Sequence, residues 1–138
     1  METNPGDPAS GPIRIAAAVI TDGEGRHLLV RKAGTGVFMQ AGGKIEAGET
    51  PLAALRRELR EELGLELDPA RPPAYLGLRR AAAANEPGRA VEAHLFAVVF
   101  SGELRTGAEI CEAIWLDPRA PITVRLAPLT RLHVLARP

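Results

Sequence analysis

Cysteine is nearly absent from this sequence of 138 residues: Cys111 is the only one, so no disulfide can form within the chain. A single cysteine is compatible with a reducing compartment. Long hydrophobic runs are also missing, and the longest one, residues 15–20, is far too short to span a bilayer. Residues 1–12 lack the basic start and the apolar core of a signal peptide. We therefore expect a cytoplasmic protein that does not enter a membrane.

An excess of charge of either sign is missing as well, because 17 basic side chains balance 17 acidic ones. No overall field attracts nucleic acid or an anionic membrane, so any polyanion must bind at a local site. We expect neither a nucleic acid polymer nor a membrane as a partner. The length, together with 46% hydrophobic residues, fits one domain with a single core.

The chain divides into a short tail and one domain. Residues 1–12, rich in Pro, Gly, Asp and Ser, are expected to form a disordered tail, and residues 13–138 a single domain. Apolar segments rich in β-branched residues predict strands at 13–21, 27–31, 37–39, 74–84, 91–101 and 110–116. Helices are predicted at 50–63 and at 126–136. This mixed order of strands and two helices predicts an α+β fold or an α/β/α sandwich.

The strongest helix signal covers residues 50–63. Thr50 suits the N-cap and Pro51 the first turn, whereas Gly64 suits the residue that ends the helix. Four leucines repeat at helical spacing and predict a buried stripe: Leu52, Leu55, Leu59 and Leu63.

Three carboxylates, Glu58, Glu61 and Glu62, share one face of this helix beside the leucine stripe. The arginines are expected on the opposite flank: Arg56, Arg57 and Arg60. Each like-charge pair at this spacing costs about 0.2–0.5 kcal/mol on an exposed helix, whereas clustered carboxylates suit Mg²⁺. The alternative is a solvated acidic face. The upstream pair Gly42-Gly43, whose backbone can approach phosphates closely, favours a site for metal-bound diphosphate.

Residues 43–65 fill the pattern G-x₅-E-x₇-R-E-U-x-E-E-x-G-U without exception, where U is apolar. A chance match to its seven fixed letters is on the order of 10⁻⁸ per start position. The segment resembles the Nudix box. The resemblance implies an α+β Nudix fold, an α/β/α sandwich around a mixed central sheet. It also implies a hydrolase that uses Mg²⁺, with Mn²⁺ as a substitute, to cut a phosphoanhydride bond in a nucleotide-like small molecule.

The resemblance implies roles for individual residues of the box. Glu58, Glu61 and Glu62 resemble the metal ligands, and the backbone carbonyl of Gly42 resembles a further ligand. Glu58 is the first choice for activating water, with Glu61 as another catalytic carboxylate. Arg57 resembles the arginine that orients a catalytic carboxylate. Glu49 is expected to tie the loop to the helix.

Outside the box the resemblance implies fewer residues. In MutT-type members another metal-binding glutamate precedes a late strand that carries tryptophan; Glu109 resembles it, and Glu112 is the alternative. Lys32 resembles a residue that contacts phosphate, and the alternative is a solvated lysine at a strand end. Gly43 and Phe38 are expected to contact the substrate.

The substrate is less well defined. Residues 80–84 carry neither the proline of ADP-ribose enzymes nor the tyrosine of dinucleoside polyphosphate enzymes. The C-terminal asparagine with which MutT-type enzymes read oxidised guanine is also missing, since Asn85 is the only asparagine after the box. The first hypothesis is a (deoxy)nucleoside triphosphate, normal or oxidised, that gives a monophosphate and pyrophosphate. An ADP-ribose or nucleotide-sugar pyrophosphatase is the alternative.

Two further points follow from the resemblance. A nucleotide-binding module without catalysis is a third hypothesis, which the complete set of box glutamates disfavours. Homodimers are common in the family, so a homodimer is one expected assembly. Ala41 stands where many members have proline before the two glycines, and it is predicted to loosen that loop slightly without removing a ligand.

Overall fold

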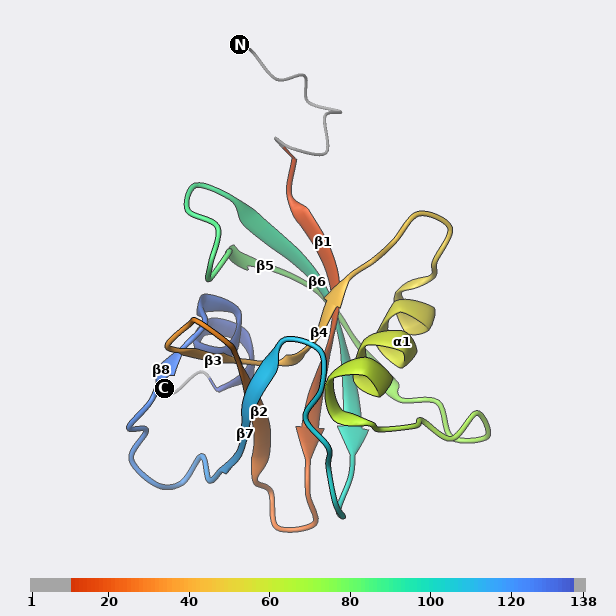
Figure 1. Cartoon of the computed structure of the whole chain (residues 1–138), viewed down its shortest axis with the longest axis vertical. Helices are drawn as coiled ribbons and strands as arrows, with labels where there is room; N and C mark the ends of the chain where they lie inside the picture. Colours follow the sequence, from red (N-terminus) through yellow and green to blue (C-terminus); the bar gives the residue numbers. More distant parts are fainter. Residues whose placement is uncertain (1–10, 136–138) are drawn as a thin grey trace.

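The computed structural model describes residues 11–135 (Figure 1). Apart from Gly11 and Pro12, the predicted tail of residues 1–12 lies outside the described residues. The elements in chain order are β1 (Ile13–Thr21), β2 (His27–Lys32), β3 (Val37–Met39), β4 (Ala41–Lys44), α1 (Pro51–Leu63), β5 (Ala74–Ala82), β6 (Ala90–Val99), β7 (Ile110–Leu116), β8 (Arg125–Leu126) and a short π-helix (Thr130–Val134).

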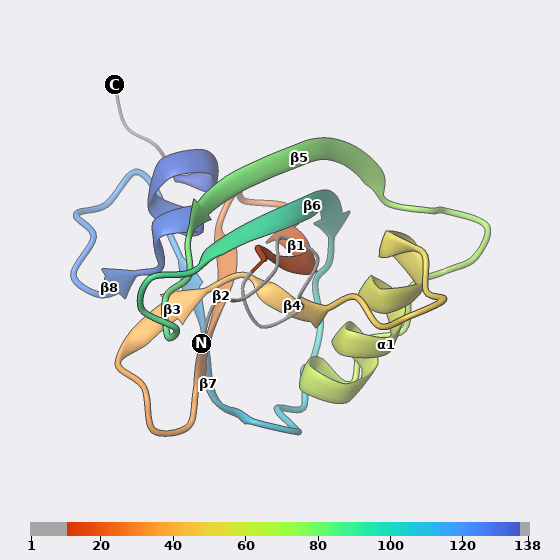
Figure 2. The ribbon, with the colours of Figure 1, turned by 90° about the horizontal axis from the view of Figure 1, so that it is seen from above.

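The strands form one mixed sheet in the order β5-β6-β1-β2-β3-β8, with β4 also paired to β1 and β7 to β2. β1 is central and runs parallel to β6, whereas it is antiparallel to β2 and β4. The predicted mixed sheet and α+β class are therefore confirmed. α1 lies on one side of the sheet and the C-terminal helical turn on the other (Figures 1 and 2).

The helix α1 begins and ends as its sequence predicts. The Thr50 hydroxyl accepts the backbone N–H of Ala53 at 3.1 Å. Gly64 adopts the left-handed conformation with φ 63°, and its N–H donates to the Arg60 carbonyl. The next N–H, of Leu65, donates to the Leu59 carbonyl at 3.2 Å, which completes the C-terminal cap. These caps fix where the acidic face of the helix starts and stops.

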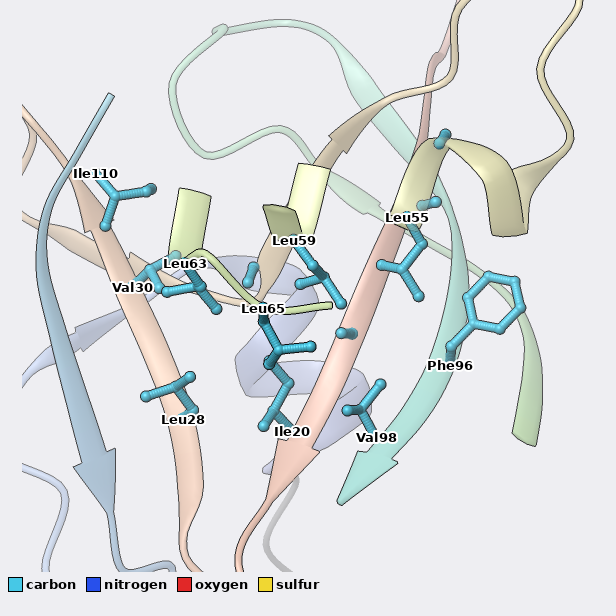
Figure 3. Packing of buried hydrophobic residues seen from close by; sticks show 14 residues of the cluster. Ile20, Leu28, Val30, Leu55, Leu59, Leu63, Leu65, Phe96, Val98 and Ile110 are labelled. Atoms are coloured by element: carbon cyan, nitrogen blue, oxygen red, sulfur yellow. The ribbon is translucent and has the colours of Figure 1, made fainter. Parts of the chain in front are cut away.

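The core between α1 and the sheet is built from the predicted leucine stripe. Leu55, Leu59 and Leu63 are fully buried against Ile20 and Val98, and side chains of the sheet interleave with them (Figure 3). On β1 small residues, such as Ala16 and Ala18, face the helix, while Ala17 faces a second cluster on the far side of the sheet. Because alternate residues of a strand point to opposite faces, β1 supports a layer on each side.

Two predicted segments differ from the structure. Gly42-Gly43, predicted as a loop, belongs to the strand β4 and pairs with Ala16 and Ala17 of β1. The helix predicted at 126–136 is a π-helix of only five residues within the described part, Thr130–Val134, preceded by the strand β8. Pro128 lacks an N–H to donate, and β8 pairs with β3, so the helix starts later than its apolar spacing suggested. No helix within residues 11–135 has the length and apolar character to cross a membrane.

Candidate functional site

Glu62 is the most deeply buried acidic residue of α1, with 5% of its surface exposed. One carboxylate oxygen accepts the backbone N–H of Gly42 at 2.9 Å, so the helix is tied directly to the strand β4. Burial raises the pKa of Glu62 to about 7; the Gly42 hydrogen bond opposes this effect, and the negative charge of Glu58 adds to it. The free energy cost of ionising this buried carboxyl makes a nearby positive charge favourable.

Glu58 faces the same strand and is held by Arg57, whose Nη1 donates to Glu58 Oε1 at 2.7 Å. The same guanidinium nitrogen lies 3.7 Å from Glu61, a half-exposed residue. The expectation that Arg57 points away from the acidic face is therefore wrong, because its long side chain reaches back across the helix. The other two arginines do point away from the acidic face. Arg56 donates a hydrogen bond to the Leu67 carbonyl, and Arg60 donates one to the Glu66 carboxylate.

Arg57 also anchors the loop that precedes the helix. Its Nε and Nη2 donate to the two carboxylate oxygens of Glu49 at 2.8 and 2.9 Å, and Nη2 donates to the Lys44 carbonyl at 3.0 Å. Hydrogen bonds from Arg57, and one from the Glu46 backbone, lower the pKa of Glu49 to about 2. Glu49 thus ties the loop to the helix, and the bidentate pair fixes the guanidinium that holds Glu58.

The two glycines of β4 are required by close contacts on both sides. A Cβ on Gly42, whose φ is 145°, would collide with the backbone oxygen of Ala16 on β1. A Cβ on Gly43 would lie 2.5 Å from the carboxyl carbon of Glu58. Gly43 therefore leaves the space that the Glu58 carboxylate occupies, and the strand passes directly under the acidic face.

Lys32, at the end of β2, and Glu109, in the loop before β7, join this acidic face. Lys32 Nζ lies 3.9 Å from Glu109, and both charges act on the pKa of Glu62. The loop is docked on α1 by the Gly107 N–H, which donates to the Glu62 carbonyl at 2.9 Å. A Cβ on Gly107 would lie 2.7 Å from the Glu61 carbonyl oxygen, so only glycine permits this contact.

Glu112, the alternative to Glu109, points to the other face of the sheet. It accepts a hydrogen bond from Arg31 Nε at 3.0 Å, and its strand position is opposite Arg31. The Arg31 guanidinium lies 6.0 Å from the centre of the Phe38 ring, away from α1. The geometry thus brings Glu109, and not Glu112, toward the helix acids.

The carboxylates gather on one side of β4 without closing around a point. Across residues 11–135, no group of three or more His, Cys, Asp or Glu side chains is arranged to hold a metal ion by itself. Mg²⁺ does not require such an enclosure, since it usually binds one or two carboxylates together with waters and substrate phosphates. The donor set here consists of oxygen atoms, and one of its members is buried, which fits such an ion.

A cavity of about 150 Å³ lies on the far side of β4 from α1. Much of its wall is apolar, from strands β1 and β6, the end of β5 and the C-terminal segment. Lys32 and Lys44 contribute positive charge, and Gly42 and Gly43 form part of the wall. The cavity and the acidic face therefore meet at the two glycines.

The predicted site residues separate into two groups. The structure brings together Arg57, all three helix glutamates, both glycines, Lys32 and Glu109. It does not bring Phe38 to them: this ring is 7% exposed and packs with Leu29 and Leu135, outside the cavity wall.

Four residues of the region were not singled out by sequence reasoning. They are Gln40, Lys44, Gly107 and Thr130. Lys44 lies inside the box motif, and this location was the only feature of the sequence that could have indicated its place near the site. The other three acquire their place through contacts between distant segments.

Comparison with known proteins identifies the family of this chain. The family described as NUDIX domain matches residues 11–135. The CTP pyrophosphohydrolase of Escherichia coli (strain K12) is 34% identical over 122 residues, which cover 84% of this chain and 84% of that protein. The RNA pyrophosphohydrolase of Halorhodospira halophila is 49% identical over 47 residues, 34% of this chain.

A solved structure also resembles this chain over most of its length. The solution structure of the E. coli ORF135 protein superimposes with a TM-score of 0.65 at 33% identity, covering 87% of this chain and 84% of that one. The chain spans only part of some relatives: 26% and 32% of the length of the first two curated proteins that it matches.

Proposed function

Since the chain belongs to the Nudix family of hydrolases, we propose that it cuts a phosphoanhydride bond in a (deoxy)nucleoside triphosphate, normal or oxidised. The products would be a nucleoside monophosphate and pyrophosphate. A cytoplasmic location and a homodimer stay predictions.

The observation that carries this proposal is that three residues belong to both halves of the site. Gly42 lines the cavity and donates its N–H to Glu62. Gly43 lines the cavity and leaves room for Glu58. Lys32 lines the cavity and pairs with Glu109. A nucleoside held in the cavity would therefore direct its phosphates across β4 toward the carboxylates.

The carboxylates are the proposed holders of a divalent cation, Mg²⁺ or Mn²⁺. Glu58, Glu61 and Glu62, with Glu109 and the Gly42 carbonyl, supply only oxygen donors, as these ions prefer. When bound, the cation would neutralise phosphate charge and polarise the phosphorus under attack.

The chain's own residues would perform the remaining steps. Glu58, held by Arg57 at 2.7 Å, is the first choice to take the proton from the attacking water, and Glu61 is the second. Lys32 would stabilise the charge that develops on the phosphates, as a point-charge donor. The bidentate Arg57–Glu49 pair keeps Glu58 in position while the proton moves.

The relatives support a nucleotide more than a polymer as substrate. The match to the CTP pyrophosphohydrolase extends over 84% of both chains, whereas the match to the RNA pyrophosphohydrolase is confined to 26% of that protein. Among the candidate substrates, we therefore rank nucleoside triphosphates first and the 5′ ends of RNA last.

The test is a substrate panel assayed with Mg²⁺ and with a chelator, in which the products are identified. The panel holds the ribo- and deoxyribonucleoside triphosphates, 8-oxo-dGTP, ADP-ribose, a nucleotide sugar and a 5′-triphosphorylated RNA. The proposal expects Mg²⁺-dependent release of pyrophosphate from at least one triphosphate, at a higher kcat/KM than for the other classes. Cleavage of ADP-ribose or the nucleotide sugar alone would move the enzyme to that class.

A further inference from the structure

Two buried polar atoms in the cavity wall have no hydrogen-bond partner among the described residues: Gln40 Oε1 and Thr130 Oγ1. Gln40 is 5% exposed and Thr130 is 0% exposed. Buried polar atoms in folded proteins are nearly always paired, and exceptions often mark a place where a ligand or a water completes the bond. Both residues line the same cavity, although they come from segments far apart in the chain.

The orientation of the Gln40 amide follows from its other contact. Its Nε2 donates to the Ala18 carbonyl at 3.0 Å, and a backbone carbonyl can only accept. The reverse orientation would bring two acceptors together. With Nε2 directed at Ala18, the unpaired group of the Gln40 amide is the acceptor Oε1. The hydroxyl of Thr130 can either donate or accept.

The rest of the cavity suits a flat, largely apolar ring with phosphates at one end. Ile15, Ala17 and Leu129 line it with apolar atoms, and Lys32 and Lys44 lie on the side of the glycine strand. The other charged group of the wall is Glu86, which lies 3.7 Å from Lys44 Nζ. A nucleobase placed here would meet Gln40 and Thr130 with a polar edge.

We propose that Gln40 and Thr130 select nucleotides whose base carries an amino group beside a ring nitrogen that accepts, the edge shared by cytosine and adenine. The inference rests on the proposed function, because it assigns the base end of the same substrate. The amino group donates to Gln40 Oε1, and the Thr130 hydroxyl donates to the ring nitrogen.

Replacing the amino group by a carbonyl, as in uracil or hypoxanthine, reverses the donor and the acceptor of this edge, but only one of the two contacts is lost. The Thr130 hydroxyl can turn and accept from the ring N–H. Gln40 Oε1 cannot adapt, because its amide is held by Ala18, and it would face another acceptor. Gln40 therefore supplies the selectivity, and Thr130 supplies affinity for both kinds of base.

The test is calorimetric binding of nucleoside monophosphates to the full chain, which needs no turnover. CMP is compared with UMP, and AMP with IMP, since each pair differs in the amino group. We expect the amino member of at least one pair to bind roughly tenfold or more tightly. Equal affinities within both pairs, or no binding of any of the four, would overturn the proposal.

Two variants separate the roles. Thr130→Val removes a hydroxyl that has no partner in the described residues, so it should fold with an unchanged or higher Tm and weaken both members of the preferred pair alike. Gln40→Met should bring the ratio within that pair close to one. Thr123→Val, an exposed threonine outside the cavity wall, is the matched control and should alter neither affinity.

Unchanged affinities in Thr130→Val would mean that its hydroxyl does not touch the base, and would overturn the assignment. If Gln40→Met does not fold, the wild-type ratios and Thr130→Val still decide the question. Amino-selective binding without hydrolysis of any triphosphate would count against the proposed function and leave this inference in place.

Discussion

At the scale of single residues, Glu62 combines a stabilising and a destabilising feature. Its carboxylate accepts the Gly42 N–H, but it is 5% exposed and its pKa is raised to about 7 by burial. Above that pH the folded chain must keep a negative charge away from water. A protein selected for stability alone would place a neutral residue here, which is consistent with a functional role for the charge.

A first prediction follows for the metal-free protein. A carboxyl whose pKa is raised on folding stabilises the fold most below its unfolded value of 4.5, and this stability is lost as the pH rises toward 7. In a chelator, Glu62→Gln should therefore match the wild type near pH 4.5 and exceed it at pH 8, by up to about 3 kcal/mol. Urea unfolding at several pH values measures the difference.

The matched control is Glu66→Gln. Glu66 is exposed, and its pKa is lowered by the hydrogen bond from Arg60, so it should give no such gain at pH 8. A Glu62→Gln protein that is no more stable than the wild type at pH 8 would contradict the burial argument.

A second prediction concerns activity at the same position. Glu62→Gln should lower kcat roughly 100-fold or more, because the variant loses a charged oxygen donor. Glu66→Gln should keep normal turnover. Near-normal kcat in Glu62→Gln, with a substrate that the wild type cleaves, would remove the metal role from the helix.

A third prediction distinguishes the two late glutamates. Glu109→Gln should reduce kcat, because Glu109 lies beside Lys32 and acts on Glu62. Glu112→Gln should have little effect on kcat, because Glu112 pairs with Arg31 on the other face. Side-by-side kinetics with saturating Mg²⁺ decide between them, and loss of activity in Glu112→Gln alone would show that the assignment is reversed.

At the scale of elements, the strand β4 is the part on which the site depends. Its two glycines let it pass between the acidic face of α1 and the cavity. Glu58 leaves no room for a side chain at Gly43, since an added Cβ would lie 2.5 Å from the end of the Glu58 side chain. The end of a glutamate can move, so the fold should tolerate the change, whereas the position of the carboxylate should not.

A fourth prediction follows. Gly43→Ala should fold with a similar Tm but lower kcat roughly 100-fold, since misplacing a catalytic group by about 1 Å can cost that much. Gly36→Ala, at a glycine with open space around it, is the control and should keep full activity. Full activity in Gly43→Ala would mean that the position of Glu58 is not critical.

The elements also illustrate what the sequence could and could not predict. The capped helix and its three carboxylates were predictable, because caps and spacings of three and four are local. The strand character of Gly42-Gly43 was not, since it comes from pairing with β1, and glycine is rare in strands. Gln40, Gly107 and Thr130 depend on contacts between distant segments and left no pattern in the sequence.

At the scale of the whole molecule, the sheet divides the site in two. The carboxylates lie on the α1 side, and the cavity lies on the side of the C-terminal turn, where Thr130 closes it. Among residues 11–135, the residues that belong to both halves lie in β4 and at the end of β2. A substrate that uses both halves must therefore be long enough to cross β4, with its base on one side and its phosphates at the carboxylates.

This arrangement predicts which bond is cut. A base bound in the cavity as proposed would place Gly42 and Glu62 beside the start of the phosphate chain, not its end. Water that is activated at Glu58 or Glu61 should then attack an inner phosphorus, and pyrophosphate should leave.

The most direct measurement is a single turnover of the best triphosphate with Mg²⁺, in which both products are identified. The account predicts nucleoside monophosphate and pyrophosphate in equal amounts. Orthophosphate and nucleoside diphosphate as the sole products would contradict it, because the carboxylates would then act on the far end of the phosphate chain.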